Sequence, residues 1–365
     1  MKYRWKEKYL LKGLENAIKH NDIATIQNYE SMLDMIRGKD YLEFDIPEPT
    51  YDELLKNYAT DMEYIEDSIF DRCSNVFNIV NNEDEIFTNL VHTRFDINNK
   101  ELLQLGYEII ESIKDPKALK IYQEIIRNKN HYINIEDDTD LDDEHTSLYG
   151  VTIYDHVEKK SYIAIKRRYT IFDLSTLVHE MMHAIMYKYN DRKYYVCNYF
   201  EELEGLFGES ITAQYLRKHD MAKYADEMEA YNLYLTIYQS YMLYLNDVIF
   251  FNSKDGKFNT EAATKMITEE TPFKETYIDE ENIPYICELP GFKMLTNIID
   301  YMICLELRNK YTPEEQVLFI KQLRKIENYD FYNKEMTTVF DFYNDDNKQI
   351  REEKERLDKK IRVLN

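Results

Sequence analysis

The sequence His179-Glu-Met-Met-His183 constrains this chain more than any other stretch. In an α-helix, residues four positions apart lie on the same face, so the two imidazoles can reach one metal ion. Zinc is the expected metal because it accepts nitrogen ligands in a tetrahedral arrangement, with one position open to water in catalytic sites. Glu180 follows the first histidine directly, so its carboxylate can accept a proton from that water. The motif therefore predicts a zinc site with Glu180 as the general base.

The residues around the motif favour a metal site over a chance match. The flanking segments 174–178 and 184–187 are mostly apolar and predict a helix, with Asp173 as its N-cap. Imidazoles and a carboxylate within an apolar helix are costly unless they have partners. A bound cation would supply that partner.

The composition predicts a mostly α-helical protein. Its 365 residues include 8 glycines and 7 prolines, few turn formers for this length. Apolar periodicity predicts helices over 51–80, 100–129, 200–218, 222–250, 292–309 and 347–363. Residues 149–154 and 161–166 alternate with period two and predict one antiparallel β-hairpin just before the metal helix.

Charge and cysteine content restrict the partners and the compartment. The formal net charge of -23, with no basic stripe, argues against nucleic-acid binding. No apolar run approaches about 18 residues, and the first residues lack an apolar signal core, so no membrane association is expected. The four cysteines, which are scattered, argue for a reduced, cytoplasmic setting; they are Cys73, Cys197, Cys287 and Cys304.

Two histidines require a third ligand, and the next predicted helix carries the candidates. Glu202 follows His183 after 18 residues, a spacing that lets a second helix return antiparallel beside the first. Gly205 would let the two helices approach closely. Glu204 is the rival, since it lies nearer the apolar side of this helix. Glu209 shares the face of Glu202 and could either orient a histidine or serve as the ligand itself if the helix starts late.

The segment from about Tyr162 to Leu216 resembles the oligoendopeptidase F and thimet oligopeptidase family, zinc peptidases within the wider HExxH-plus-Glu group. The similar stretches are Tyr162-Ile-Ala-Ile, Asp173-Leu-Ser-Thr-Leu-Val-His-Glu-Met-Met-His-Ala and Glu202-Leu-Glu-Gly-Leu-Phe-Gly-Glu-Ser-Ile. The resemblance implies a multi-helix zinc-peptidase fold, with Glu202 as the ligand and Glu209 as the second glutamate. It also suggests that an edge strand, here Ile163-Ala-Ile-Lys166, receives the substrate backbone by strand addition.

The chain departs from the family pattern at several positions. Met182 and Met186 stand where the family usually has Gly and His, and no histidine follows His219. The family has a transition-state histidine near its C-terminal end, and Ile283-Pro284-Tyr285 is similar to the segment that carries it. A tyrosine hydroxyl can stabilise an oxyanion. Tyr285 is therefore one candidate for this role, and Tyr301 is another.

The resulting hypothesis divides the chain into three regions. Residues 1–135 form an N-terminal helical region, 136–260 the catalytic zinc-binding core, and 261–365 a C-terminal helical region that completes the cleft. We expect a zinc metallopeptidase that acts on oligopeptides. The alternative is a non-catalytic or narrow-target module that binds a peptide or protein on a metallopeptidase scaffold. The sequence indicates no oligomeric state.

Overall fold

The computed structural model describes most of the chain, and the account below is confined to those residues. They are residues 4–19, 26, 29–30, 32–33, 53, 55–56, 58–59, 65–80, 93–127, 132–137, 150–155, 159–190, 201–254, 257–271, 278, 282–287, 291–323, 340 and 347–364. The fold is mostly helical with a small sheet, as predicted. The chain groups into two compact units, each made of two segments: residues 1–46 with 94–195, and residues 47–93 with 196–365. The predicted division into three regions stays a prediction.

The first unit contains a three-stranded sheet with the order β1-β3-β2. The antiparallel pair β2 (Gly150–Asp155) and β3 (Lys160–Arg167) confirms the predicted hairpin. The strand β1 (Tyr132–Asp137), which the sequence did not reveal, pairs with β3 in parallel. The prediction that residues 163–166 form an edge strand is therefore wrong, because β3 is the central strand. Parallel pairing joins segments that are distant in sequence, so periodicity alone could not show it.

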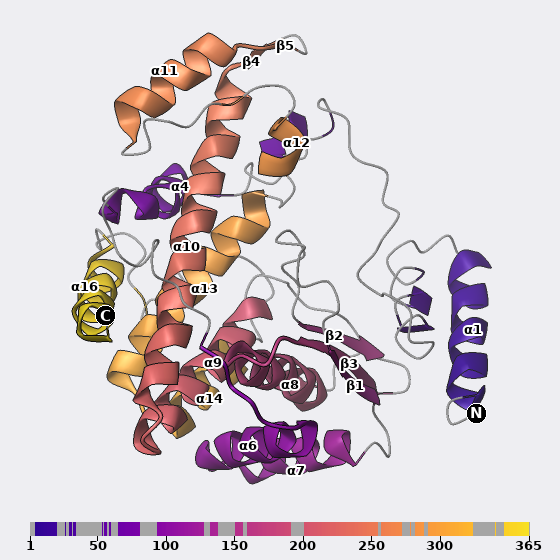
Figure 1. The fold of residues 1–365 in the computed structure, drawn as a ribbon. Coiled ribbons are helices and arrows are strands. Elements are labelled where there is room, and N and C mark those ends of the chain that lie inside the picture. The colour runs from indigo at the N-terminus through magenta and orange to yellow at the C-terminus, as the bar shows by residue number, and fades with distance from the viewer. Residues whose placement is uncertain are drawn as a thin grey trace. The chain divides into compact units, whose positions relative to one another are not determined.

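Helices cover both faces of this sheet. The helix α8 (Phe172–Asn190) packs on β2 and β3, while α6 (Asn99–Ser112) and α7 (Pro116–Ile126) pack against α8 (Figure 1). On the opposite face, α1 (Arg4–Lys19) places Leu10 in a buried cluster with Tyr162 and Ala164.

Helix boundaries in this unit correct two predictions. The single helix expected over 100–129 is two helices, because Lys114 adopts a positive φ of 59° and the Asp115 side chain caps the start of α7. Asp173 is not the N-cap of α8 but lies within its first turn. Its carboxylate accepts the backbone N–H groups of Arg168 and Tyr169, at 2.9 Å each.

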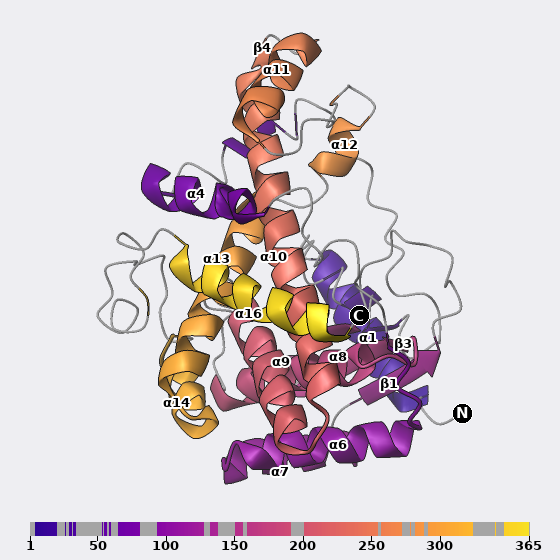
Figure 2. The same ribbon diagram turned by 60° about the vertical axis from the view of Figure 1, so that its left-hand side comes forward.

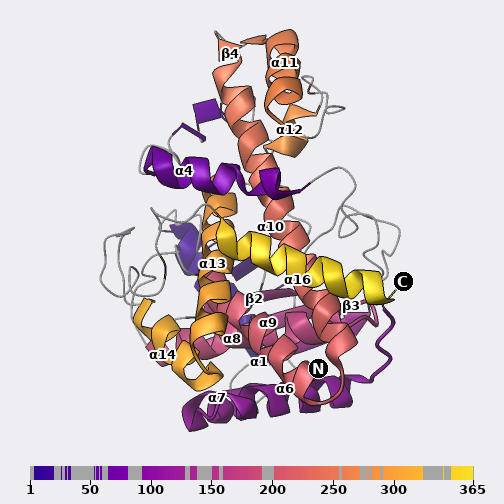
Figure 3. The same ribbon diagram turned by 90° about the vertical axis from the view of Figure 1, so that its left-hand side faces the viewer.

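Three long helices, α9, α10 and α13, pack together in the second unit (Figure 1). They span Glu201–Lys218, Ala222–Phe251 and Gly291–Lys310, as predicted to within two residues. The C-terminal helix α16 (Lys348–Leu364), also predicted, crosses α10 and α13 (Figures 2 and 3). Within the segment 51–80, the structure describes α4 (Asp67–Ser74) and the 3-10 helix η1 (Val76–Ile79). Smaller elements complete this unit: β4 (Ser253–Lys254), β5 (Lys257–Phe258), α11 (Thr260–Glu270), α12 (Ile283–Ile286) and α14 (Pro313–Leu323).

A buried ion network fastens α16 to this unit. Glu229 on α10 is 6% exposed and accepts hydrogen bonds from Arg217, Arg308 and Arg356. Arg308 also binds Glu353 of α16, with 2.7 Å between Nη2 and Oε2. Burial alone would raise the pKa of Glu353, but hydrogen bonds and charge from Arg356 and Arg308 lower it to about 2. These contacts join four helices, because the three guanidinium groups come from α9, α13 and α16.

Among the described residues, no helix combines the length and the apolar character needed to cross a membrane.

Candidate metal centre

The motif residues lie together in the middle of α8. The ring centroids of His179 and His183 are 4.7 Å apart, as their four-residue spacing on a helix predicts. His183 and Glu180 are each 6% exposed, and His179 is half-buried. Val178 before Glu180 and Met181 and Met182 after it are fully buried, so the helix is anchored on both sides of Glu180.

The strand β2 lies directly against Glu180. A Cβ atom added to Gly150 would lie 2.8 Å from Glu180 Cγ, 3.0 Å from Glu180 Oε1 and 2.5 Å from Thr176 Cγ2. The Thr152 hydroxyl donates a hydrogen bond to the Glu180 carbonyl oxygen at 3.0 Å. Only a residue without a side chain fits this position, so Gly150 allows the close approach of strand and helix.

Further along β2, an aromatic pair continues the contact with α8. Tyr154 stacks on Tyr187, with 5.4 Å between their ring centroids, and Tyr187 lies 6.5 Å from the His183 ring. In the part of the chain that the structure describes, β2 pairs only with β3. The sheet edge beside Glu180 therefore belongs to β2 rather than to β3.

The three candidate glutamates of α9 have different surroundings. Glu202 is half-buried, and its Oε1 lies 2.7 Å from Lys293 Nζ on α13. Glu204 is fully buried. Glu209 accepts a hydrogen bond from the Asn232 side chain on α10.

Among the described residues, His179, His183 and Glu202 form a group of possible metal ligands. One ligand atom from each residue lies within 4.8 Å of the other two. Glu204 and Glu209 are not members of this group. Two imidazole nitrogens and one carboxylate oxygen match the donors that catalytic zinc prefers. That these residues bind zinc stays a prediction.

Two residues of α13 that sequence reasoning missed hold the backbone beside Glu202. The Asp300 carboxylate is 1% exposed and accepts the backbone N–H of Leu203. Burial and the charge of Glu202 raise the pKa of Asp300 well above its usual range, and Lys293 opposes this shift. The Cys304 thiol lies 3.6 Å from the Leu203 carbonyl oxygen, as a weak donor. The feature of the sequence that could have identified Asp300 is that it is the only charged residue in the otherwise apolar run Ile298–Met302.

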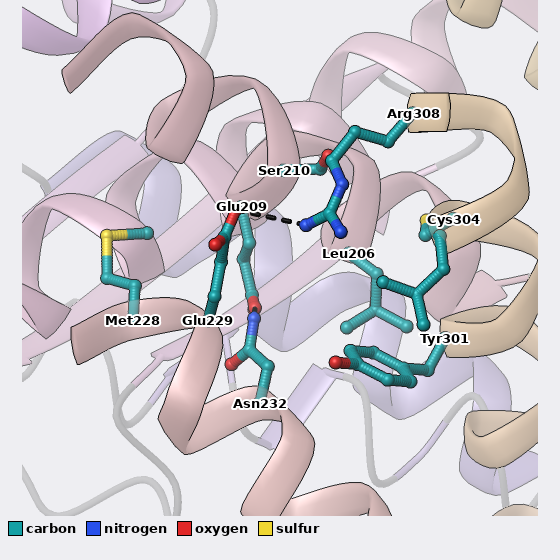
Figure 4. Close-up of a pocket in the computed structure, with 10 residues that line it drawn as sticks. Leu206, Glu209, Ser210, Met228, Glu229, Asn232, Tyr301, Cys304 and Arg308 are labelled. Atoms are coloured by element: carbon teal, nitrogen blue, oxygen red, sulfur yellow. Dashed lines mark hydrogen bonds and ion pairs between the residues drawn. The ribbon is translucent and has the colours of Figure 1, made fainter. Parts of the chain in front are cut away.

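The two candidate tyrosines are placed differently. Tyr285 lies in α12, but its side chain is outside the described part of the structure. Tyr301, on α13, is 6% exposed, and its hydroxyl has no hydrogen-bond partner among the described residues. It points into a small pocket between α9, α10 and α13 (Figure 4). The pocket is lined by Leu206, Glu209, Ser210, Met228, Glu229, Asn232, Tyr301, Cys304, Leu305 and Arg308. The space in this pocket is about 20 Å³, which is room for about one water molecule.

Comparisons of sequence and of structure give different results. No family model and no curated protein matches this chain. Three solved structures resemble its fold. A candidate oligoendopeptidase F is 11% identical with a TM-score of 0.51, covering 94% of this chain and 66% of its own. A candidate oligoendopeptidase F from Bacillus anthracis strain Ames is 10% identical with a TM-score of 0.53, covering 96% and 64%.

The third structure is PZ peptidase A with an inhibitor, at 12% identity and a TM-score of 0.50, covering 100% of this chain and 69% of its own. The chain thus spans about two thirds of the length of these proteins. At such low identity the likeness establishes the fold.

Proposed function

We propose that this protein is a zinc metallopeptidase that hydrolyses peptide bonds in oligopeptides. The observation that carries the proposal is the grouping of ligand atoms from His179, His183 and Glu202 within 4.8 Å, with Glu180 on the same helix as the two histidines. The likeness to oligoendopeptidase F structures supports a peptide substrate. Neither observation alone would suffice, because metal sites and folds each serve many reactions.

Glu180 carries the proton transfers in this proposal. Zinc, when bound, supplies a Lewis acid that activates water and polarises a peptide carbonyl. The Glu180 carboxylate accepts a proton from the attacking water and then delivers it to the leaving nitrogen. The contact with Gly150 and the buried helix on both sides restrict where this carboxylate can lie. Such restriction matters because a general base must reach the proton it abstracts.

The edge of β2 is the proposed docking strand for the substrate backbone. It replaces the sequence-based assignment to residues 163–166, which lie in the central strand. An extended peptide can pair with the N–H and C=O groups of an exposed sheet edge. The contact between Gly150 and Glu180 supports this choice, since it places the start of β2 beside the proposed base.

A tyrosine hydroxyl is proposed to stabilise the developing oxyanion. Of the two candidates, Tyr301 has a hydroxyl that solvent does not reach. A substrate carbonyl would not reach it in this conformation either. Tyr285 is therefore the stronger candidate.

Replacing Glu180 with Gln tests the proposal. The variant should bind one zinc ion as the wild type does but lose cleavage of a mixed peptide library by a factor of about 100 or more, because the amide cannot accept the proton. Glu124→Gln, an isosteric change at a half-buried ion pair with Lys188, is the matched control and should leave cleavage unchanged. Undiminished turnover in Glu180→Gln would refute the mechanism.

The alternative is a peptide- or protein-binding module on the same scaffold. Met182, Met186 and the absence of any histidine after His219 favour it, since the chain lacks groups that the resembling family uses. Chelator treatment separates the two functions. Cleavage that a chelator abolishes supports the enzyme, whereas intact peptides at every pH support the binding module. A protease with a single protein target would leave generic peptides intact yet cut that protein.

A further inference from the structure

We propose that Asp300 is a positioning residue for Glu202, because it fixes the first turn of the helix that carries this ligand. The inference rests on the proposed zinc site. It assigns to α13 a role that is separate from both the metal ligands and the base. The contacts that carry it all lie within the second unit.

The first turn of any helix has backbone N–H groups without partners inside the helix. In α9 the N–H of Leu203, the residue directly after Glu202, is bound by the Asp300 carboxylate. The Leu203 carbonyl oxygen is the acceptor for the Cys304 thiol. Both backbone groups next to Glu202 are thus held from α13, so the start of α9 cannot move without breaking these contacts.

The side chain of Glu202 is held from the same direction. Lys293 Nζ lies 2.7 Å from its Oε1. Lys293, Asp300 and Cys304 are spaced by seven and four residues, which places them on one face of α13. One helix face therefore contacts both the carboxylate of Glu202 and the backbone beside it.

Asp300 is costly to the fold, which points to a role beyond packing. Its side chain is 1% exposed, and its Oδ1 has no hydrogen-bond partner among the described residues. A buried carboxylate with an unpaired oxygen destabilises a protein. An apolar residue would pack here at lower cost, but it could not hold the Leu203 amide.

The consequence concerns metal affinity. Groups that orient metal ligands typically change the affinity by 10- to 100-fold when they are removed. Without the Asp300 acceptor, the first turn of α9 would fray, and Glu202 would sample positions in which it does not face the metal.

The test uses the full chain and compares Asp300→Leu, which removes the acceptor with little change of shape, with Asp300→Asn, whose Oδ1 can accept the same N–H. Glu306→Ala, which removes a carboxylate that pairs with Lys310 on the same helix, is the control. Zinc affinity is measured by competition with a chromogenic chelator. Hydrogen exchange is measured across the start of α9 in zinc-free protein.

Asp300→Leu should weaken zinc binding about tenfold and speed exchange at the start of α9 by a similar factor. In Asp300→Asn and Glu306→Ala, both the zinc affinity and the exchange rate at the start of α9 should stay within about twofold of the wild-type values. If Asp300→Leu does not fold, Asp300→Ser is measured instead, because its shorter side chain does not span the same distance.

Two outcomes would overturn the inference. One is wild-type zinc affinity in Asp300→Leu. The other is an equal loss of zinc affinity in Asp300→Leu and Asp300→Asn. That result would mean that the charge of Asp300, rather than its hydrogen bond to the Leu203 amide, sets the affinity. A wild-type protein that binds no zinc contradicts the proposed function instead. In that case the exchange measurement still tests whether Asp300 holds the start of α9.

Discussion

Gly150 at the start of β2 faces the side chain of Glu180, so closely that an added Cβ would lie 2.8 Å from Glu180 Cγ. The contact joins the edge of the sheet to the proposed base. It also explains why a glycine stands here, since any larger residue would push the strand or the helix away. The position of the Glu180 carboxylate therefore depends on a residue that carries no chemical group of its own.

Replacing Gly150 with Ala should lower turnover much more than zinc binding. The new methyl group would also meet Thr176 Cγ2 at 2.5 Å, so the helix or the strand must shift. A shift of about 1 Å at a catalytic group can cost about 100-fold in rate. Turnover of a peptide substrate and zinc content are the measurements.

Gly106→Ala is the matched control for this substitution. Its Cβ would meet the Tyr122 hydroxyl at 2.5 Å, so it is equally crowded, but its nearest atoms do not include Glu180. It should lower stability without a comparable loss of turnover. Equal losses of turnover in both variants would show that crowding of the unit, not the position of Glu180, limits catalysis.

The Glu229 network should dominate the stability of the second unit. Replacing Glu229 with Ala leaves Arg217, Arg308 and Arg356 close together without their shared acceptor. Breaking a buried pair in this way costs about 3–5 kcal/mol. Urea unfolding measures the loss. Glu269→Gln, at the exposed pair with Lys265, should cost less than about 1 kcal/mol, and a similar cost for the two variants would contradict the prediction.

Acid should weaken the attachment of α16 through Glu353. Its folded-state pKa is about 2, below the ordinary value of 4.5, so its contribution to stability is present above pH 4.5 and is lost as the pH falls toward 2. From pH 6 to pH 3 the loss should be on the order of 2 kcal/mol. Unfolding free energies of the wild type and Glu353→Gln, measured at both pH values, check this. The difference between the two proteins should shrink at pH 3, and a constant difference would refute it.

Tyr301→Phe should leave stability unchanged or raise it by about 1 kcal/mol. Its hydroxyl is buried without a hydrogen-bond partner among the described residues, so removing it relieves a desolvation cost. Turnover should change by less than about threefold. A loss of about 100-fold would instead support Tyr301 as the oxyanion donor, because removing such a donor has that effect. Thermal melting and steady-state kinetics provide both measurements.

Local patterns predicted a large part of this protein. The helix of the HEMMH motif, the long helices α9, α10, α13 and α16, and the β2–β3 hairpin all follow from periodicity over neighbouring residues. The geometry of His179 and His183 was also predictable, because four-residue spacing on a helix is a property of the backbone. The spacing of Glu202 from the motif favoured it as the third ligand for a similar reason.

Only the tertiary structure decided the surroundings of these residues. The parallel strand β1 makes β3 central, and Gly150 reaches Glu180 across 30 positions of sequence. Asp300 and Lys293 reach the start of α9 from a helix about 90 residues away. Such contacts arise when packing brings distant segments together, and no local pattern encodes them. The sequence alone thus determined the chemistry that the chain offers, whereas packing decided which groups hold that chemistry in place.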